Sequence, residues 1–136
     1  MKARIIAVGL LVMIAYSLFL FVEYYRIDKH DKTMSAITET AYRIHLYVQA
    51  HGIPPEHLSM IEPLDGHINR TEDAWGNSLK YSYDNTGLFR LESLGANGLL
   101  GGEGDNRDVA RSFRWQNESG GVLSDEAFWA SERSIP

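Results

Sequence analysis

The sequence contains no cysteine, and only four of its 136 residues are proline. The lack of cysteine excludes disulfides, thiolate nucleophiles and zinc sites that use thiolate ligands. A chain of this length can form one small domain with an additional segment, but not two domains with separate cores. Any cross-link that stabilises so small a domain must therefore use another chemistry, such as a metal ion held by oxygen atoms.

Clusters of positive charge are also scarce. The formal net charge is -5, and residues 72–136 carry eleven Asp and Glu against six Lys and Arg, whereas residues 1–71 carry seven of each kind. Nucleic-acid-binding domains gather cations on one face, so we expect no nucleic-acid partner.

The sequence also lacks the arrangements that catalysis needs. It has no HExxH motif and no nucleophile with an adjacent base, so we expect neither enzymatic activity nor a small-molecule substrate. The five histidines are scattered along the chain. We expect them to be solvated, including His30, although Asp28 and Asp31 flank it.

One long apolar run lies near the N-terminus. No charged residue occurs between Ile5 and Val22, and eighteen helical residues rise about 27 Å, close to the thickness of a hydrocarbon core. The run ends in bulky side chains, which do not suit signal-peptide cleavage. It predicts a transmembrane anchor over residues 1–22, with the following side chains in the bilayer: Ile5, Leu11, Ile14, Leu18 and Val22.

The orientation of this anchor does not follow from charge, because Lys and Arg are nearly balanced on its two flanks. The short N-terminal tail favours a cytoplasmic N-terminus. The rest of the chain then lies on the far side of the membrane.

A second helical pattern follows the apolar run. Apolar residues recur at steps of three and four, which places them on one face of a helix: Met34, Ile37, Ala41, Ile44 and Val48. Gly52 and Pro54 then predict the end of the helix. We expect one continuous helix from about Ile5 to His51, with a membrane half first and an amphipathic half second.

The next part of the chain predicts a β-hairpin. Apolar and polar residues alternate over 79–83 and again over 89–92, and Asp84 to Gly87 reads as the turn between them. We expect this hairpin and a later third strand to pack on the amphipathic half of the helix. The globular domain is predicted to span residues 23–113, and residues 114–136 are predicted to be a partly disordered C-terminal extension.

A glycine-rich segment follows the hairpin. Five of the sixteen residues from 93 to 108 are glycine, and oxygen-bearing side chains lie among them: Asn97, Glu103, Asp105, Asn106 and Asp108. Calcium takes six to eight oxygen ligands at flexible geometry, so the segment could bind it. Composition alone favours a flexible linker equally. Neither a phosphate-binding Gly-Lys-Ser sequence nor an EF-hand pattern is present.

The segment from Asp73 to Val109 resembles the C-terminal domain of the major pseudopilin of type II secretion systems. The resemblance is carried by Trp-Gly-Asn at 75–77, Ser-Leu-Gly-Ala at 93–96 and Gly-Gly-Glu-Gly at 101–104. It implies an α+β, pilin-like fold, in which a long N-terminal helix packs on a small antiparallel β-sheet with a calcium-binding loop. It also implies a structural subunit or accessory of a secretion or pilus-like assembly, with other pseudopilin or secretion-system subunits as partners. The location would be the bacterial inner membrane, with the globular domain in the periplasm.

The resemblance further implies calcium as the cofactor and a set of ligands for it. These are the carbonyl oxygens of Leu94 and Leu99 and the side chains of Asn97, Asp105 and Asp108. The family usually has Asp at the position of Asn97. An amide keeps an oxygen ligand but removes a charge, so we expect weaker binding here.

The N-terminus departs from the family pattern. The Gly-Phe processing site and the Glu within the apolar run have no counterpart in residues 1–22. A second hypothesis is therefore a stand-alone, membrane-anchored periplasmic binding domain that has this fold and does not enter a fibre.

Overall fold

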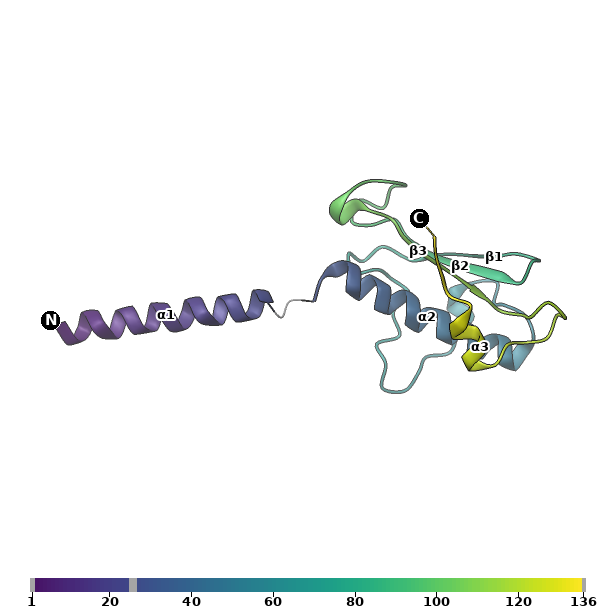
Figure 1. The fold of residues 1–136 in the computed structure, drawn as a ribbon, viewed down its shortest axis with the longest axis horizontal. Coiled ribbons are helices and arrows are strands. Elements are labelled where there is room, and N and C mark those ends of the chain that lie inside the picture. The colour runs from purple at the N-terminus through teal and green to yellow at the C-terminus, as the bar shows by residue number, and fades with distance from the viewer. Residues whose placement is uncertain (1, 25–26, 136) are drawn as a thin grey trace.

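The computed structural model describes the backbone of residues 2–24 and 27–135, and the side chains of residues 9, 11–22 and 27–133. A first helix leads into an α+β domain, in which one helix crosses a small antiparallel sheet (Figure 1). The elements in chain order are α1 (Lys2–Tyr24), α2 (Lys29–His51), β1 (Lys80–Tyr83), β2 (Leu88–Ser93), β3 (Val109–Arg114), α3 (Asp125–Ala130) and β4 (Arg133–Ile135), with short 3-10 turns at Leu58–Met60 and Gly104–Asn106.

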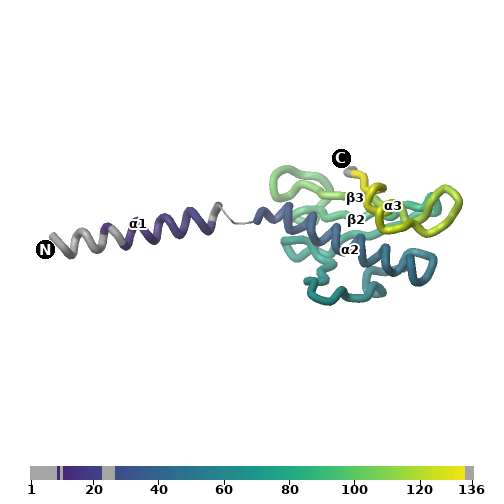
Figure 2. The backbone as a smooth tube through the Cα atoms, turned by 60° about the horizontal axis from the view of Figure 1, so that its bottom comes forward, coloured from purple at the N-terminus to yellow at the C-terminus, as the bar shows by residue number. Residues whose placement is uncertain are grey.

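The N-terminal helical region is two helices, so the prediction of one continuous helix is wrong. Asp28 has extended backbone angles of φ -56° and ψ 146°, and its side chain accepts a hydrogen bond from the backbone N–H of His30. This is an N-cap, which satisfies a free N–H at the start of a helix and so begins α2 afresh. The break separates α1 from the domain (Figures 1 and 2).

Replacing Asp28 with alanine is expected to lower the free energy of unfolding by about 1 kcal/mol, because the cap of α2 is lost. Asp28→Asn is the matched control, since its side-chain oxygen can still accept from the His30 N–H. Urea unfolding of the full chain in detergent micelles, followed by circular dichroism, measures both. Equal losses for the two variants would contradict the assignment of Asp28 as the cap.

Helix α1 displays apolar side chains to its surroundings. Leu11, Ile14, Leu18 and Val22 are 57–66% exposed, and Ile5 lies outside the residues whose side chains are described. Among the described residues, no helix combines the length and the apolarity needed to cross a membrane. The transmembrane anchor therefore stays a prediction.

The predicted packing of α2 on the sheet is confirmed. Ile37, Ala41, Ile44 and Val48 are completely buried against the inner face of the sheet. Gly52 ends α2 in the left-handed conformation, with φ 79°, and its N–H donates to the carbonyl of Val48. Gly52 is thus the helix stop that the sequence predicted.

The sheet is antiparallel throughout, with the strand order β1-β2-β3-β4. The predicted hairpin is present, because Asp84 Oδ1 accepts from the N–H groups of Thr86 and Leu88 and closes the turn between β1 and β2. On the inner face, the rings of Phe89 and Phe113 stack at 5.4 Å between centroids, and Phe128 of α3 lies 5.2 Å from Phe113.

The C-terminal segment contains two further elements. Residues 125–135 form α3 and β4, and β4 pairs with β3, so this part of the predicted extension is folded. The physical reason is Phe128, which is completely buried in the core. The side chain of Asp125 also binds α2, through His45 Nε2 at 2.9 Å and the amide of Gln49 at 2.9 Å.

These contacts predict a pH dependence. The hydrogen bond from His45, and next that from Gln49, lower the pKa of Asp125 below its ordinary value. A carboxyl group whose folded pKa is lowered stabilises the fold above its unfolded pKa of about 3.9, and this stabilisation is lost as the pH falls through the lowered folded value. Asp125→Asn is therefore expected to flatten the fall in stability on acidification, when thermal unfolding is followed from about pH 5 to pH 2. The control is Glu126→Gln at the exposed neighbouring residue, and equal profiles for the two variants would contradict the role of the Asp125 contacts.

Residues 53–70 form an irregular segment that is fastened to α2. The guanidinium of the buried Arg43 donates to the carbonyls of Glu62, at 2.8 Å, and Ile61, at 3.2 Å. The hydroxyl of Thr40 donates to the carbonyl of Arg70. The side of α2 that faces away from the sheet is thereby flanked by this segment.

Candidate metal centre

The glycine loop, residues 94–108, joins β2 to β3 and lies over the same end of the domain as the start of α2 (Figures 1 and 2). Its two ends are held together by a hydrogen bond of 2.8 Å from the N–H of Ala96 to the carbonyl of Asp105. The predicted ligands therefore share one closed loop.

Two glycines make this closure possible. A Cβ atom at Gly95 would lie 2.6 Å from the carbonyl carbon of Asn106, and one at Gly102 would lie 2.7 Å from its oxygen. Both glycines have positive φ, 67° and 121°, which residues with a side chain rarely adopt. The conformation of the loop thus requires glycine at positions 95 and 102. Composition alone shows only that the segment is rich in glycine.

Among the predicted ligands, Asp108 has a buried side-chain oxygen without a hydrogen-bond partner in the described part of the chain. One of its carboxylate oxygens accepts from the N–H of Gly101 at 2.8 Å. The other, Oδ1, is buried and has no hydrogen-bond partner among the described residues. A buried carboxylate oxygen without a partner lowers stability unless a donor or a cation reaches it. Asp108 therefore fits a cation ligand.

The structure gives less support to the other predicted ligands. Asn97 is exposed, and its Oδ1 accepts from the N–H of Leu99 at 3.1 Å. Asp105 is exposed within the 3-10 turn, and Leu94 is buried at the end of β2. In the part of the chain that the structure describes, no three His, Asp or Glu side chains converge on a point that could hold a metal ion. The predicted set contains two carboxylates together with amide and carbonyl oxygens, and all of these are ligand types that suit calcium. The calcium site stays a prediction.

The turn at Asp73–Asn77 supports the base of the loop. Asp73 is 3% exposed; its Oδ1 accepts from the N–H groups of Trp75 and Asn77, and its Oδ2 accepts from the hydroxyl of Ser93 at 2.6 Å. The amide of Asn77 donates to the carbonyl of Gly95 at 2.8 Å. This turn, which lies before the hairpin in sequence, thus fixes the first glycine of the loop.

Helix α2 holds the other end of the loop through His30. Its Nε2 donates to the carbonyl of Gly104 at 3.0 Å, and its ring meets that of Trp75 edge-on at 5.1 Å. The expectation that the histidines are solvated is wrong for His30 and also for His45, which is completely buried. Gly104, which accepts from His30, is 74 residues away, and Asp125, which contacts His45, is 80 residues away, so no local pattern could have identified these two contacts.

The fold and the loop together define a class, which is an α+β domain with a glycine-rich loop after its hairpin. Residues 55–112 match the family model described as type II secretion system (T2SS), protein G. The resemblance to the pseudopilin family is therefore confirmed over the stretch that contains the hairpin and the glycine loop. No curated protein matches the chain.

Proposed function

We propose that this chain is a structural, pseudopilin-like subunit or accessory of a type II secretion or pilus-like assembly in a bacterial envelope. The observation that carries the proposal is that the matched stretch, residues 55–112, contains β1, β2, most of β3 and the glycine loop that His30 of α2 contacts. Pseudopilins are structural proteins, so the chain is assigned no chemical step. Its work is to associate with other subunits.

The proposal includes membrane anchoring by α1, with the N-terminus in the cytoplasm and the globular domain in the periplasm. It is supported by the exposed apolar side chains of α1 and by the absence of charged residues from Ile5 to Val22 in the sequence. Exposed Leu, Ile and Phe along a helix favour contact with lipid or with other apolar helices over contact with water.

Calcium is the cofactor that this proposal assigns to the glycine loop. The carboxylates of Asp105 and Asp108, the side chain of Asn97 and the carbonyls of Leu94 and Leu99 would hold it. The ion would supply a positive charge to the buried Oδ1 of Asp108. It would also order the loop between α2 and the turn at residues 73–77.

Calcium is expected to raise the free energy of unfolding of the full chain by about 1–3 kcal/mol at concentrations up to a hundred times the dissociation constant. Asp108→Asn should remove most of this gain, because it replaces the charged ligand with a neutral one of the same shape. Thermal unfolding in detergent micelles, with calcium or with a chelator, measures the difference. Glu118→Gln, an exposed residue outside the loop, is the control and should keep the full gain. Equal stability with calcium and with chelator would contradict the assignment of the ion.

The subunit role itself is tested by crosslinking in native membranes. A photo-crosslinking residue at Leu18 in α1 should give adducts with pseudopilins or other secretion-system proteins of the same membrane. The alternative of a stand-alone binding domain is supported if the chain is present in the membrane and such adducts do not form.

A further inference from the structure

A pocket of about 310 Å³ lies between the first turns of α2 and the irregular segment of residues 53–70. Its lining includes two isoleucines, two cations and one acid: Ile27, Ile68, Lys32, Arg70 and Glu39. We call it the isoleucine pocket. The two isoleucines come from different parts of the chain and are 61% and 73% exposed. An exposed apolar patch rimmed by charged groups is typical of a contact with a protein or a membrane.

The cations of the pocket are available to an anionic group. Lys32 and Arg70 are exposed, and neither forms an ion pair with a carboxylate of the described residues. The side chain of Glu39 is only 19% exposed, and its Oε2 lies 3.3 Å from Nδ1 of His67. Asp31, next to Lys32, is exposed and offsets part of the positive charge. An anion at the mouth of the pocket therefore meets two free cations, whereas the acid in the lining is turned to another partner.

The isoleucine pocket lies at the end of the domain that is joined to α1. Helix α1 ends at Tyr24, α2 begins at Lys29, and Ile27 lies between them. Figures 1 and 2 show α1 leading away from this end of α2. With α1 in a bilayer, as proposed above, the pocket adjoins the headgroup layer of the same membrane.

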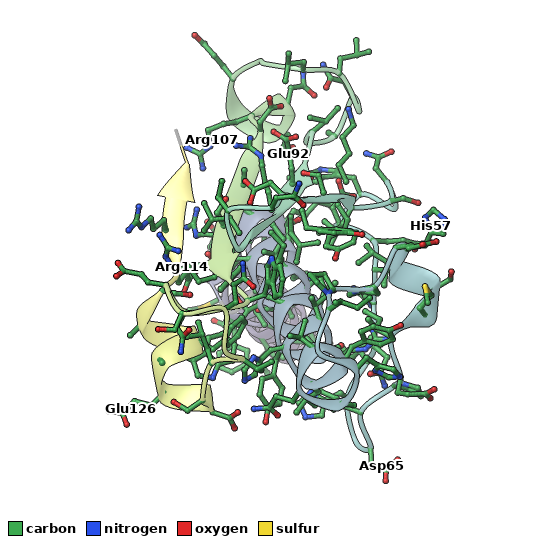
Figure 3. All side chains as sticks on the ribbon, turned by 90° about the vertical axis from the view of Figure 1, so that its right-hand side faces the viewer. His57, Asp65, Glu92, Arg107, Arg114 and Glu126 are labelled. Atoms are coloured by element: carbon green, nitrogen blue, oxygen red, sulfur yellow. The ribbon has the colours of Figure 1, made fainter. Side chains whose placement is uncertain are left out.

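The break between the two helices lets the domain lean towards that membrane. The N-cap at Asp28 starts α2 as a separate helix, so no continuous helix holds the domain upright. The segment that carries Ile68 flanks the side of α2 that faces away from the sheet. In Figure 3, viewed from the end opposite α1, Asp65 of this segment lies at the lower edge of the domain, and Glu92 of the sheet lies on the upper side. The domain can thus rest on this edge while the sheet stays clear of the bilayer.

Phospholipid headgroups suit both parts of the lining. Their phosphates accept hydrogen bonds from ammonium and guanidinium groups, and apolar side chains are stabilised at the boundary between headgroups and acyl chains. The attraction between basic residues and an anionic leaflet falls off within a Debye length, which is about 8 Å at physiological ionic strength. It therefore acts on cations that lie beside the membrane anchor, as Lys32 and Arg70 do.

We propose that the isoleucine pocket docks the domain onto the phospholipid surface beside α1. Phosphates of anionic phospholipids contact Lys32 and Arg70, and Ile27 and Ile68 insert among the headgroups. The proposal rests on the membrane anchoring proposed for α1 and adds a second, lipid-dependent contact that holds the domain against the bilayer.

The lack of native cysteine allows one fluorophore to be placed on the full chain in nanodiscs that hold a single copy and a lipid with a nitroxide quencher on its headgroup. Ile68→Cys places the fluorophore at the pocket. Ile53→Cys is the matched control, because Ile53 is 62% exposed but follows the far end of α2, whose 23 residues span about 35 Å. In bilayers with about one third anionic phospholipid, quenching at position 68 should be at least about threefold that at position 53. Equal quenching, the result expected if the pocket serves a partner protein instead, would overturn the proposal.

Charge substitutions test the two cations. Lys32→Gln together with Arg70→Gln should lower quenching at position 68 at least about threefold, and so should bilayers of zwitterionic lipid alone. Lys29→Gln is the control: Lys29 lies 5.8 Å from the centroid of the Trp75 ring and does not line the pocket, so quenching should change little. An equal effect of Lys29→Gln, or no effect of the double substitution, would overturn the assignment of the contact to this pocket.

A label in α1 separates this proposal from the anchoring on which it rests. Leu18 is 64% exposed on α1, and a fluorophore at Leu18→Cys should be quenched by nitroxides on the acyl chains. If it is quenched there while positions 68 and 53 behave alike, the anchoring stands and the docking fails. If position 18 is not quenched and positions 68 and 53 behave alike, both fail.

Discussion

Replacing Phe128 with alanine is expected to lower the free energy of unfolding by about 3–5 kcal/mol. Phe128 is completely buried, and its ring stacks on that of His45 at 4.3 Å and on that of Phe113 at 5.2 Å. Truncation removes the apolar area of the ring from the core and leaves a cavity beside two other phenylalanines. For a small domain this is a large share of the total stability.

Urea unfolding of the full chain in detergent micelles, monitored by tryptophan fluorescence, measures the loss. Phe128→Leu is the matched control. It keeps most of the apolar volume and should cost less than half as much. A loss below about 1 kcal/mol for Phe128→Ala, closer to the range of exposed substitutions, would contradict the placement of α3 in the core. The C-terminal segment would then be only loosely attached to the rest of the domain.

Replacing Gly95 with alanine is expected to be the most damaging change in the glycine loop. The added Cβ would lie 2.6 Å from one backbone atom of Asn106 and 2.7 Å from the carbonyl oxygen of Asp105. Backbone cannot move aside as the end of a flexible side chain can, so the two ends of the loop would have to separate. The positive φ of Gly95 adds about 1–2 kcal/mol.

Gly101→Ala separates the steric cost of the added Cβ atom from the cost of the positive φ. Gly101 also has a positive φ, 81°, but no atom among the described residues lies within 4 Å of the position that its Cβ would occupy. Gly95→Ala should therefore cost at least about 2 kcal/mol more than Gly101→Ala in unfolding free energy, a difference typical of overpacking. It should also abolish the calcium-dependent part of the stability, whereas Gly101→Ala should retain some of it. Equal costs would show that the ends of the loop are not in contact.

The parts of the fold that follow from local pattern were predictable. The stripe from Ile37 to Val48, the helix stop at Gly52 and the turn at Asp84–Gly87 are each encoded within a few residues. The glycine loop could be located from its composition and its motifs. Its close packing could not, because the contact between Gly95 and Asn106 is a property of the folded backbone.

The break between α1 and α2 has a local signal in the sequence. Asp28 precedes the helix, and a second acid, Asp31, lies in its first turn, a combination that favours a helix start. The apolar pattern on both sides of the break masks this signal. The fold of residues 125–135 has only weak local signals, because α3 has six residues and β4 has three. Both depend on tertiary contacts, namely the burial of Phe128 and the pairing of β4 with β3.

The measurement that tests the central claim most directly is secretion by cells that lack this protein. If the chain is a working subunit of a type II secretion assembly, its removal should leave the exported proteins inside the cell envelope. The wild-type chain should restore export, and Gly95→Ala should restore little of it. Export that continues unchanged without the protein would contradict the assignment of the chain to the secretion assembly.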